Sequence, residues 1–141
     1  MALTRKGNPS LMPFRYSDLI VWQKSMDLAR EIYRVTASFP VTERYGLTSQ
    51  LRRAAVSVPS NIAEGHGRAS TGEYLNQLSV ARGSLFELET MMLLAEQLEY
   101  ADPGRVAKAK ALTNEIDRML VGLRSKLARK KRGPPSSPLA L

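Results

Sequence analysis

The residues of this chain that could do chemistry gather between positions 50 and 68, where polar side chains recur at helical spacing. On a helix of 3.6 residues per turn, one face collects Gln50, Arg53, Ser57, Asn61 and Glu64. Three interpretations are open: a solvated flank, a structural polar network that fixes helix register or a subunit interface, and a ligand or catalytic site. The structural network is favoured because every member has a side chain that hydrogen-bonds.

A carboxylate elsewhere in the chain supports the network. Glu87 falls within an apolar seam of a later helical segment, and Ser84 precedes it by about one turn. Burying a carboxylate alone is costly, so Glu87 needs a cationic partner. Arg52 or Arg53 could supply that charge. We therefore expect these residues to join the network and fix a helix register or an interface between subunits.

No catalytic or metal-binding motif emerges. His66 is the only histidine, and its place between Gly65 and Gly67 predicts an exposed position at a helix end. A general base or a metal site would need further partner residues. The sequence contains no cysteine, so disulfides, thiolate metal sites and cysteine nucleophiles are excluded, which fits a reducing compartment. We expect no enzyme, no metal and no cofactor.

Apolar residues recur at intervals of three and four over about 17–38, 43–64, 71–99 and 103–127, which predicts four helices. No strand pattern appears. With 141 residues the chain is expected to form one domain, and short connections favour an all-α, antiparallel, up-and-down four-helix bundle. Its expected divisions are a flexible basic lead (1–15), the bundle (16–127) and a disordered, basic, proline-rich tail (128–141).

Local signals predict the helix boundaries. Thr42-Glu43 is expected to start the second helix, Pro59 to kink it, and Gly65 and Gly67 to end it with positive φ angles. Ser70, three residues before Glu73, predicts a capping box for the third helix, and Asp102-Pro103 predicts the start of the fourth.

The third helix is apolar on more than one side. Its second seam comprises Val80, Ser84, Glu87, Met91, Leu94 and Leu98. A four-helix monomer rarely hides so much of one helix, so this pattern predicts self-association.

The net charge of +8 lies at the two ends of the chain. Residues 1–15 hold three basic residues and residues 124–141 hold six, with no acid in either segment, so residues 16–123 carry about −1. The six C-terminal cations are Arg124, Lys126, Arg129, Lys130, Lys131 and Arg132. They either keep the protein soluble or bind RNA or DNA electrostatically, and clustering in an oligomer favours nucleic acid. No aromatic residue lies among them, so base stacking is not expected there.

No apolar run approaches the length of a membrane span, and the first residues lack the apolar core of a secretory leader. We therefore expect a cytoplasmic protein without membrane contact.

Several segments, taken in this order and spacing, match a known family. They are Asp18–Lys24, Tyr45–Leu47, Gln50–Ala55, Ser57–Gly65 and Ala81–Glu89. Over about residues 16–127 the chain resembles the bacterial four-helix bundle family of 23S ribosomal RNA intervening-sequence proteins. That family is related to the accessory variability determinant proteins of diversity-generating retroelements.

The resemblance implies an antiparallel four-helix bundle that assembles into a barrel-like homopentamer, with no known enzymatic activity. It also implies kinship with retroelement proteins that bind a reverse transcriptase and nucleic acid through a basic surface, whereas residues 16–123 here are slightly acidic. The expected function is a non-enzymatic oligomeric scaffold that binds RNA or DNA through its basic ends. The alternative is a protein-interaction adaptor with no nucleic-acid role.

Overall fold

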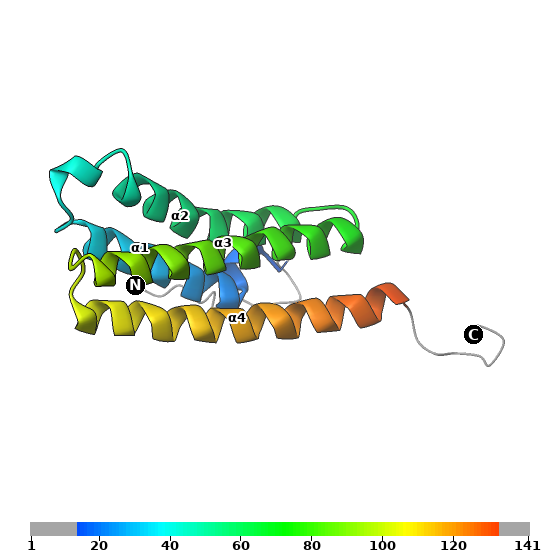
Figure 1. Cartoon of the computed structure of the whole chain (residues 1–141). Coiled ribbons are helices and arrows are strands. Elements are labelled where there is room, and N and C mark those ends of the chain that lie inside the picture. Colours follow the sequence, from blue (N-terminus) through cyan, green and yellow to red (C-terminus); the bar gives the residue numbers. More distant parts are fainter. Residues whose placement is uncertain (1–13, 133–141) are drawn as a thin grey trace.

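The computed structural model describes residues 14–132 and consists of four helices packed antiparallel as a bundle (Figure 1). The order is η1 (Tyr16–Asp18), α1 (Ile20–Thr36), η2 (Val41–Glu43), α2 (Leu47–His66), α3 (Thr71–Gln97) and α4 (Pro103–Arg132). Each helix packs against its neighbours in the chain, and α4 closes the ring by packing against α1. The all-α, up-and-down fold expected from the sequence is confirmed for the single chain.

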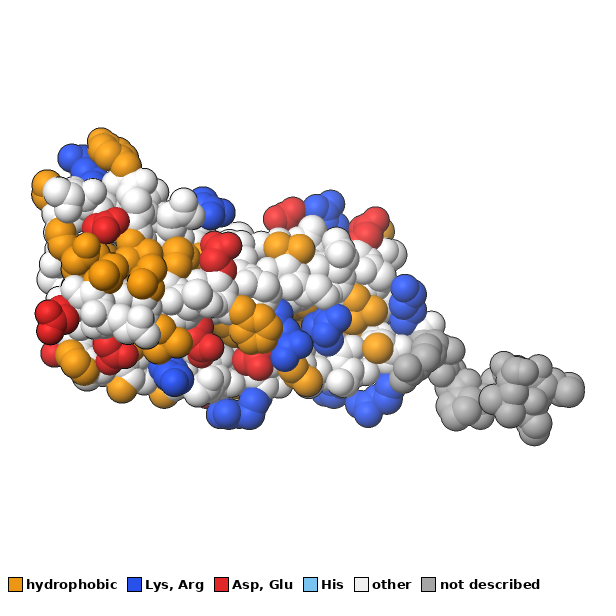
Figure 2. Space-filling view, viewed as in Figure 1, with side chains coloured by type: hydrophobic (Ala, Val, Ile, Leu, Met, Phe, Trp, Pro, Cys, Tyr) orange, Lys and Arg blue, Asp and Glu red, His pale blue; other side chains and the backbone are white. Residues whose placement is uncertain are grey.

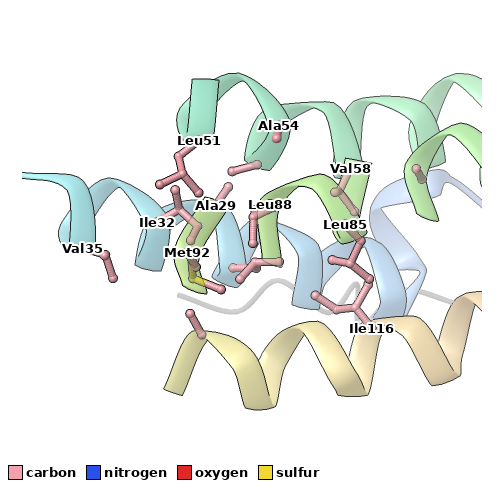
Figure 3. Packing of buried hydrophobic residues seen from close by; sticks show 14 of the residues in the cluster. Ala29, Ile32, Val35, Leu51, Ala54, Val58, Leu85, Leu88, Met92 and Ile116 are labelled. Carbon is pink, nitrogen blue, oxygen red and sulfur yellow. The ribbon is translucent and has the colours of Figure 1, made fainter. Parts of the chain in front are cut away.

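The core lies along the bundle axis, where apolar stripes from all four helices meet. Figure 3 shows Leu85, Leu88 and Met92 of α3 directed toward side chains of the other helices. These three side chains are at most 2% exposed. Burying a side chain of this size contributes about 1.5–3 kcal/mol relative to leaving it exposed, so the core row of α3 is a major source of stability.

The start of α2 differs from its expected position. Thr42 and Glu43 form the short η2 helix, and α2 begins only at Leu47. The prediction that α2 starts at Thr42-Glu43 is therefore wrong. Glu43 nevertheless caps α2, because its Oε1 accepts a hydrogen bond of 3.1 Å from the backbone N–H of Leu47. Its other oxygen accepts a hydrogen bond of 3.2 Å from the hydroxyl of Tyr100, which anchors the connection between α1 and α2 to the connection between α3 and α4.

The end of α2 corrects another expectation. Gly67 has a φ of −84°, and Gly65 lies within the helix, so neither glycine supplies the predicted positive φ. Gly65 instead permits close approach to α3. A Cβ there would lie 2.8 Å from Cδ1 of Tyr74 and 2.9 Å from Cβ of Gln77. The helix also continues past Pro59, which is buried.

Helices α3 and α4 begin where the sequence signals predicted. The Ser70 hydroxyl accepts a hydrogen bond of 3.1 Å from the backbone N–H of Glu73, which caps α3. Asp102 caps α4 in the same way, accepting from the N–H of Arg105 at 3.1 Å. Both predicted cap residues are confirmed, and the hydrogen bond at Ser70 is one of the two that a capping box contains.

Helix α4 is longer than expected, because it continues to Arg132. The prediction that an irregular tail begins at residue 128 is wrong for 128–132, and the lead (1–13) and tail (133–141) lie outside the described residues. Within residues 14–132, no helix combines the length and apolarity needed to cross a membrane.

Candidate functional site

A strip of polar side chains lies where α2 packs against α3. The hydroxyl oxygens of Ser57 and Ser84 are 2.8 Å apart, and Asn61 Nδ2 donates to the carbonyl oxygen of Ser57 at 2.8 Å and to its hydroxyl at 2.9 Å. All three side chains are half-buried. Because a one-residue shift between the helices would separate the two hydroxyls, this contact favours a single register of α2 against α3.

The same strip continues toward the start of α2. Arg53 Nη2 donates to Gln50 Oε1 at 3.0 Å and lies 3.5 Å from Glu87 Oε1. The Arg53 and Glu87 side chains are 66% and 50% exposed, so solvent screens this pair and it contributes at most about 1 kcal/mol. Glu87 is therefore not a buried charge in the single chain.

Two residues of the predicted network point elsewhere. Arg52 faces α1, where its Nε donates to Thr36 Oγ1 at 2.8 Å and its guanidinium lies 4.6 Å from the centroid of the Tyr33 ring. Glu64 pairs with Arg68 at 2.9 Å near the end of α2. The structure thus does not bring Arg52 or Glu64 to Glu87. Arg52 is directed toward α1, and Glu64 lies about three helical turns along α2 from Arg53, which pairs with Glu87.

The second seam of α3 lies at the surface of the single chain. Val80, Leu94 and Leu98 are 46%, 45% and 46% exposed, while Met91 is half-buried against the core. On the opposite flank of α3, Phe86 is 48% exposed. Figure 2 shows hydrophobic side chains gathered over the C-terminal half of α3. We call Val80, Glu87, Leu94 and Leu98 the outer row of α3.

The basic residues predicted to bind nucleic acid lie along the end of α4. Lys126, Arg129, Lys130 and Lys131 are exposed, and Arg124 is half-buried. Within residues 14–132 none of these five forms an ion pair with a carboxylate. Helix α4 therefore presents several cations without acidic partners among the described residues.

One contact shows where this basic end lies in the bundle. The Lys131 Nζ lies 3.2 Å from where a Cβ of Gly72 would stand, so the end of α4 lies beside the start of α3. The buried Nε of Arg124 has no hydrogen-bond acceptor among the described residues. Arg132 is the last residue of α4, and its side chain lies outside the described part of the structure.

The most buried acidic side chain was not singled out from the sequence. Glu31 is 1% exposed and lies between α1 and α4. Its carboxylate is 3.5 Å from Arg34, 3.4 Å from Arg105 and 3.6 Å from Lys108, whose side chains are 57%, 51% and 66% exposed. One carboxylate thus holds three cations that reach it from the surface, beside a groove of about 490 Å³.

A sequence signal for Glu31 exists but is weak. Glu31 and Arg34 are three residues apart on a helix, a spacing that brings side chains together. Arg105 and Lys108 are more than 70 residues away in sequence, and only the packing of α1 against α4 brings them to the carboxylate. The spacing of Glu31 and Arg34 alone therefore predicts only an ordinary ion pair on the surface of a helix.

The surroundings of His66 differ from those predicted. His66 is half-buried rather than exposed as predicted, because its ring packs between Phe14 and Tyr74, with centroids 5.8 Å and 6.0 Å away. Burial raises the pKa of the Tyr74 hydroxyl above its ordinary value. Within residues 14–132, no three acidic or histidine side chains gather in a way that could hold a metal ion.

A solved structure shares this fold. It is a protein of unknown function from the S23 ribosomal protein family of Bacteroides thetaiotaomicron, with a TM-score of 0.66 and 24% sequence identity. The match covers 74% of this chain and 98% of the Bacteroides protein. At this identity the match supports the fold alone. No curated protein matches the sequence.

A family-level comparison covers the bundle itself. The sequence pattern of the 23S rRNA-intervening sequence proteins matches residues 17–122, which include α1, α2, α3 and most of α4. The matched range contains the α2–α3 polar strip and ends before the run of cations at the end of α4. The chain belongs to the 23S rRNA-intervening sequence protein family.

Proposed function

We propose that this protein is a non-enzymatic, cytoplasmic, oligomeric scaffold that binds RNA or DNA through the clustered basic ends of its subunits. The observation that carries the proposal is the run of cations at the end of α4, which lacks acidic partners within residues 14–132. Phosphates bind such a run electrostatically and without sequence preference, and release of counterions supplies much of the affinity.

The outer row of α3 supports assembly. Val80, Leu94 and Leu98 expose almost half of their surface, and the row crosses the same face as the Arg53–Glu87 pair. A second copy of the chain would remove this apolar surface from water, which favours association by about 25 cal/mol per Å² buried. The family resemblance favours a barrel-like homopentamer as the assembled form.

Assembly strengthens the nucleic-acid proposal. Five subunits would bring together roughly thirty cations from residues 124–132, so that many weak phosphate contacts act at once. A single subunit offers only six, and it would bind weakly at physiological salt. The proposal thus links two separate features of the chain, the apolar row of α3 and the charged end of α4.

The test is the salt dependence of RNA binding by the full chain and by a variant carrying Lys126→Ala, Lys130→Ala and Lys131→Ala. These side chains are exposed, so the variant should keep its fold. Each lost phosphate contact should reduce the slope of log K against log salt by about 0.7–0.9. The matched control is Lys110→Ala, an exposed lysine near the start of α4. Equal affinity and slope in the triple variant and wild type would refute the proposal.

The same apolar row favours one alternative, a protein-interaction adaptor in which the row docks a different protein and nucleic acid has no role. Leu94→Asp would place a carboxylate in that row and should abolish capture of such a partner. Neutralising the α4 cations should leave the capture unchanged. The two variants therefore separate the adaptor from the nucleic-acid scaffold.

A further inference from the structure

A groove of about 560 Å³ runs between the second half of α1 and the start of α2. Two tyrosines and three arginines dominate its lining: Tyr33, Tyr45, Arg44, Arg52 and Arg53. It lies apart from the cations at the end of α4. We propose that this groove binds an unpaired segment of RNA, with phosphates against the arginines and a base stacked on Tyr45. The inference names a ligand for a different surface and does not depend on the end of α4.

The charge of the groove favours a polyanion. No carboxylate lines it, although residues 16–123 as a whole are slightly acidic. Within residues 14–132, only Arg53 of its three arginines pairs with an acid, and that contact with Glu87 is exposed and 3.5 Å long. A phosphate could compete for Arg53 at little cost, because exposed ion pairs are weak. The groove therefore concentrates positive charge within residues 16–123, whose net charge is about −1.

The tyrosines favour a ligand with flat, unpaired rings. Tyr45 is 87% exposed, so its ring contributes almost no packing within the chain. The Arg44 guanidinium lies 5.5 Å from the centroid of that ring, and the Arg52 guanidinium lies 4.6 Å from the ring of Tyr33. Paired arginines and aromatic rings stack readily on exposed bases, whereas bases in a duplex are already stacked.

The fold holds part of this surface in place. Arg52 is fixed by its hydrogen bond to Thr36 Oγ1, and the segment that carries Arg44 and Tyr45 follows Glu43, which caps α2 and binds Tyr100. Little conformational freedom would be lost at Arg52 on binding. A surface prepared in this way binds more tightly than one that must be ordered first.

Hydroxyl groups favour RNA over DNA. Thr48 and Ser49 also line the groove, and each hydroxyl can both donate and accept a hydrogen bond. The ribose 2′-hydroxyl has the same dual character, and it is the group by which proteins distinguish RNA from DNA. A deoxyribose segment would leave that contact unmade.

The test is fluorescence anisotropy with a labelled oligouridylate of about ten nucleotides and the full chain. Tyr45→Ala should weaken binding about 5- to 150-fold, the range expected for losing one base–aromatic stack. Tyr45→Phe keeps the ring and should bind within about twofold of wild type. Arg44→Ala should lower the salt slope by about 0.7, the value for one phosphate on a single strand. Circular dichroism would verify that each variant is folded.

Matched controls isolate the groove. Arg118→Ala removes an exposed charge on α4 outside the groove and should leave binding of the oligouridylate unchanged. An RNA duplex of the same length should show no loss with Tyr45→Ala, because its bases are not available for stacking.

Three results would overturn the inference. If Tyr45→Ala binds the oligouridylate as tightly as wild type does, no base stacks on Tyr45. If wild type binds the corresponding deoxyribose oligonucleotide as tightly as the oligouridylate, the groove does not select RNA over DNA. A lower molecular mass of Tyr45→Ala by light scattering would make this surface a contact between copies of the chain. If the α4 triple variant loses affinity while Tyr45→Ala does not, the proposed scaffold function stands and the groove assignment falls.

Discussion

The α1–α4 and α2–α3 interfaces place their charges in opposite ways. Between α1 and α4, Glu31 is almost completely buried and draws Arg34, Arg105 and Lys108 toward it from the surface. Between α2 and α3 the buried contacts are apolar or hydroxylic, and Glu87 remains half exposed at the edge.

The difference follows from side-chain size at the two interfaces. Small residues such as Gly65, Ser57 and Ser84 bring α2 close to α3, which leaves no room for long charged side chains between them. Leu112 and long basic side chains line the groove beside Glu31. The charged group of such a side chain can approach the Glu31 carboxylate and still contact water, as the exposed Lys108 does. Close packing and a buried ion cluster are thus two solutions within one bundle.

The largest expected effect comes from forcing α2 and α3 apart. Gly65→Val should destabilise the protein by about 2–3 kcal/mol, because its Cβ would stand less than 3 Å from Tyr74 and Gln77. Chemical denaturation monitored by circular dichroism measures the change. Gly122→Ala is the control: nothing lies within 4 Å of its Cβ position, so the better helix former should stabilise by about 0.5–1 kcal/mol. Equal effects at both sites would mean that the interface is not closely packed.

The two carboxylates provide the next comparison. Glu31→Gln should cost about 2 kcal/mol, because three cations lose their shared counter-charge, although their own exposure keeps the loss below that of a fully buried pair. Glu87→Gln should cost less than about 1 kcal/mol in the same denaturation experiment. A reversed order would show that Glu87, not Glu31, is the buried charge in solution.

A smaller effect should follow loss of the hydroxyl pair. Ser84→Ala should cost about 1 kcal/mol, because the Ser57 hydroxyl loses its partner across the interface. The double variant Ser57→Ala/Ser84→Ala should cost less than the sum of the single changes if the two hydroxyls interact. Strict additivity would argue against a direct bond between them.

The smallest effect concerns high pH. Burial raises the pKa of Tyr74 above its ordinary value of 10.0, so the native state holds that proton more tightly than the unfolded state. The stability that this provides is complete below pH 10.0 and is lost as pH rises through the folded pKa. Denaturation at about pH 9 and pH 11 should show a smaller loss of stability in Tyr74→Phe than in wild type. An identical loss would mean that Tyr74 is solvated.

Helical periodicity and caps were sufficient to predict the four helices and the starts at Ser70 and Pro103. The predicted start of α2 was wrong because Thr42 and Glu43 match the pattern of an ordinary cap and first turn. In the structure the Glu43 side chain instead accepts a hydrogen bond from the backbone N–H of Leu47. The role of Gly65 was also missed, since a glycine near a helix end suggests a positive φ and only tertiary structure reveals a close neighbour.

The candidate sites were predictable only in part. Helical periodicity predicted that Arg53, Ser57 and Asn61 share one face of α2, and in the structure all three lie on the side of α2 that packs against α3. Arg52 directly precedes Arg53, yet the 100° turn between them directs Arg52 toward α1. Arg52 there lines the groove between α1 and the start of α2. Residues of α1, of the connection before α2 and of α2 itself line that groove. Only tertiary packing brings them together, so no local spacing within the sequence predicts the groove.

Light scattering on the purified 141-residue chain tests the central claim most directly. If the outer row of α3 joins subunits, the mass should be several times the 15.7 kDa of one chain, about five times for the homopentamer. Leu94→Asp, which charges that row, should lower it. A wild-type mass of 15.7 kDa at micromolar concentration would contradict the oligomeric scaffold.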